Sequence, residues 1–266
     1  MCLVLGVGIA VAAAVDSIVG YRDFTDEGLP YLETSYRSQF AKSAFTQWMP
    51  MSVLRSVPNL FFFAAPLLVA LAYSWSWRSD LTGGYAAQLL TRAPRGRVYA
   101  AKAIAAFAAG AAVVGVPLLV NLAVVLCFVP AFTPSIVDVV YTGLWVRVFL
   151  SGLLYTQPVL YVIVRLALDM LLAGLWATAV LAFSCLARNR VAIVALPYIA
   201  AIVVKFVSEN LYALLGRDWG SLTVLDQLKA RGDQYYYGWG PVLLDMAVLL
   251  AFSVVVPLLA RRRDVL

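Results

Sequence analysis

Residues 88–102 read QLLTRAPRGRVYAAK, and they lie between two strongly apolar stretches of the chain. The segment carries four of the twenty Lys and Arg residues and no acidic residue. The whole chain is 63% hydrophobic and only 13% charged, whereas soluble chains are about 45–50% apolar and about 25% charged. These values predict a membrane protein, and in such proteins Lys and Arg concentrate in the cytoplasmic loops. The segment therefore bears on how the chain is threaded through the membrane.

Six apolar runs approach or exceed the length of about 20 residues that a bilayer-spanning helix needs. They cover residues 3–20, 59–77, 103–129, 166–187, 191–208 and 241–260. Backbone groups in lipid must find partners within their own segment, so each run is predicted to be a helix. We predict a single all-α polytopic transmembrane domain over residues 1–266, with six transmembrane helices and helical extracytoplasmic loops.

Residues 148–164 leave two interpretations open. They carry no charge, but the run is interrupted by Ser151, Gly152, Thr156, Gln157 and Pro158. They form either a seventh span or an interfacial or re-entrant element leading into the fourth span, and we favour the second.

The distribution of basic residues decides between six and seven spans. With six, the basic loop 78–102, the turn 188–190 and the tail 261–263 all lie on one side. A seventh span would move the turn and the tail to the outside. The positive-inside rule therefore favours six spans, with both termini and residues 88–102 in the cytoplasm.

The residue types that most often carry chemistry are scarce. The chain has no histidine, the residue most often used as metal ligand or general base. Its three cysteines, Cys2, Cys127 and Cys185, lie in or beside apolar runs without C-x-x-C spacing, which indicates free thiols. The net charge of +6 is explained by topology, so we expect no nucleic-acid partner. No phosphate-binding loop occurs, and we expect neither a metal nor a cofactor in this chain.

A short amphipathic helix is predicted within the basic loop. Its apolar face has i, i+3, i+4, i+7 spacing and consists of Ala86, Leu89, Leu90 and Ala93. Pro94 is expected to end this helix, and Gly96 to permit a sharp turn. The helix would lie on the cytoplasmic surface. It either anchors the loop on anionic membrane lipid, at roughly 1 kcal/mol per basic residue, or docks a cytoplasmic partner.

The order of residues in this loop resembles a motif of a transporter family. An acid, two glycines, two leucines, a Pro–Arg turn and a lysine follow one another as Asp80, Gly83, Gly84, Leu89, Leu90, Pro94, Arg97 and Lys102. This order is similar to the loop between the second and third spans of ABC type-2 permeases, where it forms a coupling helix. The motif covers about 25 residues, and the six-span topology covers the whole chain.

The resemblance implies a function. The chain would be one membrane subunit of an exporter in the inner (cytoplasmic) membrane of a bacterium, with no enzymatic activity of its own. ATP and magnesium would bind separate ABC ATPase subunits, and a second permease subunit would complete a homo- or heterodimer. The residues implied in coupling to the ATPase are Leu89, Leu90, Arg92, Pro94, Arg95, Arg97 and Lys102.

Four ionisable residues fall within the predicted spans: Asp16, Asp169, Lys205 and Asp245. Six-span topology places all four in the outer leaflet, within about one turn of a helix end. Arg165 precedes Asp169 at i, i+4 spacing and is expected to pair with it. Charges near helix ends commonly only anchor a span, because long side chains reach the interface. The alternative is a polar outer vestibule through which a cationic or amphipathic substrate leaves.

Two other function classes predict features that this sequence lacks. A stand-alone secondary transporter or channel predicts internal repeats or broken helices, and no convincing repeat occurs. An intramembrane enzyme would need Asp169 and Asp245 as a catalytic dyad, but no matching motif accompanies them. The small residues of 103–112 predict close helix–helix packing in lipid.

Overall fold

The computed structural model describes residues 1–23, 25–26, 42–52, 55–134, 149–187, 189–215, 223–229 and 238–262. Regular secondary structure in these ranges is entirely helical. Six helices are long and apolar enough to cross a membrane, one of them including the short helix α5. The long helices are α1 (Cys2–Asp23), α4 (Ser56–Tyr73), α7 (Arg95–Phe128), α10 (Pro158–Phe183), α11 (Arg190–Leu215) and α13 (Trp239–Arg262). The helical, multi-pass membrane prediction is confirmed at this level, by length and composition.

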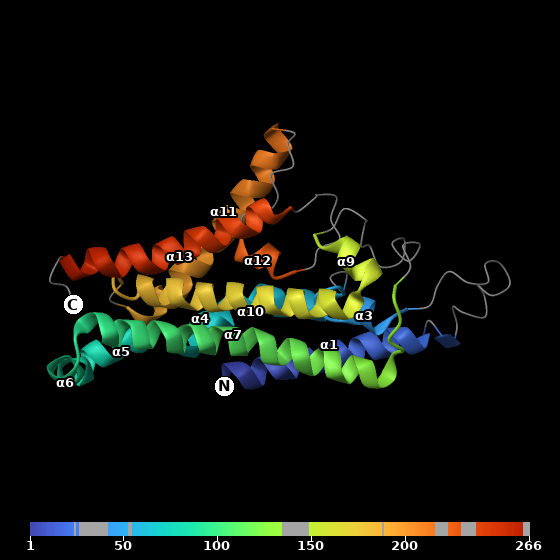
Figure 1. The fold of residues 1–266 in the computed structure, drawn as a ribbon, viewed down its shortest axis with the longest axis horizontal. Helices are drawn as coiled ribbons and strands as arrows, with labels where there is room; N and C mark the ends of the chain where they lie inside the picture. Colours follow the sequence, from blue (N-terminus) through green and yellow to red (C-terminus); the bar gives the residue numbers. More distant parts are fainter. Residues whose placement is uncertain are drawn as a thin grey trace.

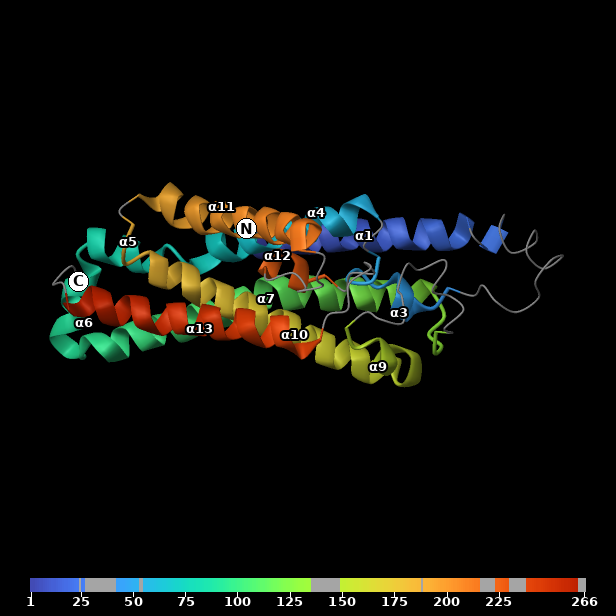
Figure 2. The same ribbon diagram turned by 90° about the horizontal axis from the view of Figure 1, so that it is seen from above.

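In the described part of the chain, five short helices lie between the long ones: α3 (Ala44–Gln47), α5 (Ser76–Thr82), α6 (Tyr85–Arg92), α9 (Ser151–Thr156) and α12 (Val224–Gln227). The long helices form an elongated bundle, with α5, α6 and the C-terminal end of α13 at one end (Figure 1). We call this the α6 end. Helices α3 and α9 lie toward the opposite end, and α12 lies beside the middle of the bundle (Figure 2).

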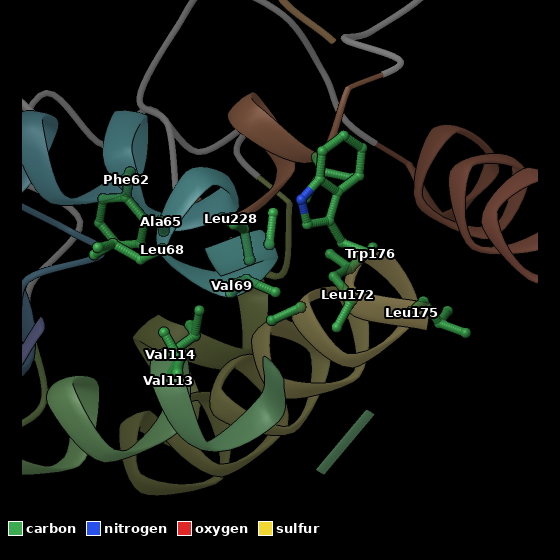
Figure 3. Close-up of a cluster of buried hydrophobic side chains, with 14 of the residues drawn as sticks. Phe62, Ala65, Leu68, Val69, Val113, Val114, Leu172, Leu175, Trp176 and Leu228 are labelled. Carbon is green, nitrogen blue, oxygen red and sulfur yellow. The ribbon is translucent and has the colours of Figure 1, made fainter. Parts of the chain in front are cut away.

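Helix α10 is the centre of the packing. It contacts α4, α7 and α13, and nearly every residue from Leu172 to Ala182 is buried. Phe62 and Val69 of α4, Val114 of α7 and Leu172 of α10 are among the side chains of this core (Figure 3).

Close contact between α7 and α10 depends on glycines, among them Gly110. A Cβ atom on Gly110 would lie 2.7 Å from the carbonyl oxygen of Ala173 and 2.7 Å from Cβ of Ala177. Any larger residue would push the two helices apart. This contact agrees with the close packing predicted for residues 103–112.

The start of α10 differs from the sequence interpretation. We expected the fourth span to start at Leu166 and residues 148–164 to form an interfacial or re-entrant element. Instead Ser151–Thr156 forms the separate helix α9, and α10 starts at Pro158. The non-helical backbone of Gln157 (φ −139°, ψ 76°) separates the two, and proline at the first helical position is already set to a helical φ. The expectation is wrong for residues 158–164.

The turn before α7 also differs. Gly96 is helical and α7 starts at Arg95, eight positions before the expected Ala103. Ala93 (φ −145°, ψ 145°) and Pro94 (φ −63°, ψ 141°) make the break, because both are extended. The positive φ in this loop occurs at Gly84 (φ 74°), directly before α6. The expected role of Gly96 in the turn is therefore wrong.

Candidate functional site

Two loop segments fold back into the bundle. The first inserted segment, residues 43–52, contains α3, and the second inserted segment, residues 223–228, contains α12. Every residue of both segments is buried. Helix α3 contacts α7 and α10, whereas α12 contacts α4, α10 and α11. The second segment forms the centre of the candidate site, because Arg165 and Lys205, two of the ionisable residues singled out in the sequence, both bind it.

A buried arginine of α10 pairs with an acid on its own helix and also reaches the second inserted segment. Nε of Arg165 donates to Oδ2 of Asp169 over 3.3 Å, and Nη2 lies 3.1 Å from Oδ1. Nη2 of Arg165 also donates to the carbonyl oxygen of Gln227. The i, i+4 pair expected from the sequence is thus present. Asp169 is fully buried, about three turns into α10. Its side chain therefore does not reach the membrane surface, as an anchoring charge would.

A second ion pair joins α11 to the same segment. Nζ of Lys205 lies 2.5 Å from Oδ1 of Asp226. The hydroxyl of Thr223 donates to the other oxygen, Oδ2, of Asp226 over 3.3 Å. Asp226 is buried and Lys205 is partly exposed. The charge predicted within the fifth span is therefore balanced by a loop residue, because a buried charge is costly without a partner.

Asp245 of α13 lies beside this network. Nε2 of Gln227 donates to the carbonyl oxygen of Pro241 over 3.1 Å, and Asp245 follows Pro241 by one turn on the same helix face. Asp245 is only 7% exposed. Among the described residues, its Oδ2 has no hydrogen-bond partner. This acid is thus buried without the compensation that Asp169 and Asp226 have.

Asp16 belongs to a different part of the molecule. It forms an ion pair of 3.1 Å with Arg55, which also donates to the Asp16 carbonyl oxygen. Nearby, Nζ of Lys42 donates to the carbonyl oxygen of Gly20 over 3.2 Å. Burial lowers the pKa of Lys42, and the neighbouring Arg55 lowers it further. The four ionisable residues of the spans therefore do not form one group, since Asp16 is paired on the α1–α4 side.

The first inserted segment is held by a neutral side chain that sequence reasoning missed. Asn121 of α7 is fully buried. Its Oδ1 accepts from the backbone N–H of Met49 over 3.0 Å, and its Nδ2 donates to the carbonyl oxygen of Ala10 over 2.9 Å. One amide thus connects α7, α1 and the segment. The sequence feature that could have revealed it is a single asparagine within a long apolar run.

Helix α6 is amphipathic, as predicted, but its apolar side faces its own chain. Leu89 and Leu90 are partly buried and pack against the bundle core. The exposed side consists of Tyr85, Gln88, Thr91 and Arg92. Any partner of α6 therefore meets mainly this polar side.

The other residues named for coupling have different surroundings. Pro94 and Arg97 are exposed, while the side chain of Arg95 lies outside the described part. Lys102 forms an ion pair with Asp80 of α5 and lies 5.8 Å from the ring centroid of Tyr73. Lys102 thus links α7 to α5 and is only slightly exposed.

Comparisons with protein-family models, curated proteins and solved structures give no match to this chain. Within the described ranges, no group of three or more Cys, Asp or Glu residues is placed to hold a metal ion. Two features of the structure bear on function. One is the network of buried charges on helices α10, α11, α12 and α13, and the other is the amphipathic helix α6.

Proposed function

We propose that this chain is the transmembrane permease subunit of an ABC transporter, and that it exports its substrate across the bacterial inner membrane. ATP would be hydrolysed by separate ATPase subunits, and a second permease subunit would complete the pathway. The observation that carries the proposal is α6, a short amphipathic helix between the second and third candidate spans. Its residue order is the one that resembles the coupling loop of type-2 permeases.

The connections of helix α6 would allow a partner that moves α6 to move α7 as well. The backbone N–H of Ala93 donates to the carbonyl oxygen of Leu89 over 3.0 Å, so the helix end is closed. Only Ala93 and Pro94 separate it from the 34-residue helix α7. The Asp80–Lys102 ion pair links α5 to α7 as well. A force on the exposed face of α6 would therefore move α7, which packs on α10.

The buried charges on α10–α13 would then form the polar part of the pathway. A cationic or amphipathic substrate would replace Lys205 at the carboxylate of Asp226, or Arg165 at the carboxylate of Asp169. Asp245 would be the first acid to receive such a cation, because its Oδ2 has no partner among the described residues. We assign these roles as part of the same proposal.

The test is recovery of an ATPase with the tagged chain from membranes of its native host. Tyr85→Ala combined with Arg92→Glu removes two exposed contacts of α6 and should lower ATPase recovery about tenfold, the effect of about 1.4 kcal/mol. The matched control is Arg22→Glu, an exposed arginine in the last turn of α1. Failure to recover any ATPase with the unmodified chain would overturn the proposal.

One observation favours a second candidate, a stand-alone secondary transporter or channel. Asp245 is buried in a candidate span, and its Oδ2 has no hydrogen-bond partner among the described residues. Acids inside the membrane often mark ion pathways. The purified chain in liposomes distinguishes the two. Uptake driven by an ion gradient without ATPase, and abolished by Asp245→Asn, would establish the second candidate.

A further inference from the structure

A crevice of about 580 Å³ opens between the first half of α7 and the second half of α13. Its α6 end is lined by Leu81 and Leu90, and its far end by Phe107 and Leu250. No residue of the charge network on α10–α13 lines it. The crevice is a separate feature of the α6 end, and nothing in the proposed function uses it.

The wall of the crevice is apolar. The hydroxyls of Thr178 and Ser253 lie 3.1 Å apart, and each also donates to a carbonyl oxygen of its own helix. Nε1 of Trp77 and the hydroxyl of Tyr99 have no hydrogen-bond partner among the described residues, but both atoms are buried and are not open to the crevice. A water in the crevice would find few of the two to four polar partners that it needs. A hydrocarbon occupant fits this wall better than a polar one.

The rim of the crevice faces outward from helices that are candidate membrane spans. Ile104 on α7 is 71% exposed, and Leu250 and Leu258 on α13 are each 55% exposed. In a bilayer, these side chains meet acyl chains rather than water. A chain from the surrounding lipid can therefore enter sideways.

One arginine, Arg97, lies on the face of α7 that lines the α6 end of the crevice. Arg97 is exposed in the first turn of α7 and shares a helix face with Ala100 and Ile104, at i, i+3 and i+7. Arg97 lacks an ion pair with any described acid, and the nearby Asp80 is already paired with Lys102. Guanidinium groups favour phosphate through paired charged hydrogen bonds.

We propose that the crevice between α7 and α13 binds one acyl chain of an anionic phospholipid, with the headgroup phosphate at Arg97. Because Leu90 of α6 lines the same crevice, the bound lipid connects α6 to α13. The site requires no partner chain, so it stands whether or not an ATPase couples to α6.

The experiment uses the purified full chain with phosphatidylglycerol that carries a photoreactive diazirine in its acyl chain. Peptide mass spectrometry after illumination should place the label on residues 96–107 and 250–258. Phosphatidylcholine with the same acyl chain should label these residues less. Label on the exposed faces of α1 and α11 as strong as that on residues 96–107 and 250–258 would overturn the proposal.

Two variants separate the acyl and headgroup contacts. Ala100→Trp puts an indole into the crevice from an exposed position and should reduce its labelling to background, while Ala12→Trp on exposed α1 should not. Arg97→Gln should abolish the preference for phosphatidylglycerol, while Arg22→Gln should retain it. Unchanged labelling in Ala100→Trp, or cross-linking of two chains across the crevice, would contradict a lipid site.

Discussion

The two inserted segments are held in the bundle by different chemistry. The first, residues 43–52, is fastened by neutral hydrogen bonds through Asn121. The second, residues 223–228, is fastened by the hydrogen bond from Arg165 to the carbonyl oxygen of Gln227 and by the ion pair Lys205–Asp226. A neutral amide is cheap to bury once it is bonded, whereas a buried charge depends strongly on its partner. The first segment thus resembles a permanent part of the core, and the second resembles one whose attachment is conditional on charge.

The largest effect is expected at Asp169. Asp169→Ala leaves Arg165 buried without its carboxylate, and breaking such a pair costs about 3–5 kcal/mol. The double change Arg165→Met with Asp169→Leu removes both charges and should cost far less. Chemical unfolding in detergent, followed for each variant, measures the difference. Equal losses for the single and double variants would show that the cost does not come from leaving Arg165 unpaired.

A smaller loss is expected at Lys205. Lys205→Met removes a charged hydrogen bond to buried Asp226, and such bonds contribute about 1.5–3 kcal/mol. Lys205→Arg keeps the charge and should retain most of the stability. Protease accessibility of residues 216–237 provides a second measurement, because a released segment is cleaved sooner. A Met variant as resistant as the unmodified chain would contradict this role.

Removing the neutral attachment at Asn121 should lower the free energy of unfolding by as much as Lys205→Met or by less. Asn121→Leu leaves the backbone N–H of Met49 without its partner, which costs about 1–3 kcal/mol. Leu119→Ala, at a position 47% exposed on the same helix, serves as the control with little expected effect. Thermal unfolding in detergent compares the two. If Leu119→Ala destabilises as much as Asn121→Leu, the amide is not what holds the first segment.

The smallest effect is expected for the exposed pair on the α1–α4 side. Arg55→Gln removes its ion pair with Asp16, whose side chain is 43% exposed, and exposed pairs contribute about 0–1 kcal/mol. The same unfolding measurement applies. If Arg55→Gln lowers the free energy of unfolding as much as Asp169→Ala does, the exposed pair is as important for stability as the buried charges beside the second segment.

Part of the candidate site was predictable because its contacts are local. Arg165 and Asp169 share one helix, and i, i+4 spacing alone brings them together. The partner of Lys205 was not predictable, since Asp226 lies in a polar stretch that reads as an ordinary loop. The start of α10 was also missed. Pro158 looked like an interruption, although at a first helical position proline favours the helix.

The sequence by itself determined the six long apolar helices and the amphipathic α6, because hydropathy and helical periodicity are properties of consecutive residues. Only the tertiary structure decided that residues 43–52 and 223–228 return into the bundle, and that Asp245 is buried while Asp16 is paired near the surface. Such choices depend on which distant segments fill the space between helices. A buried charge requires a partner, but local sequence does not specify where in the chain that partner lies.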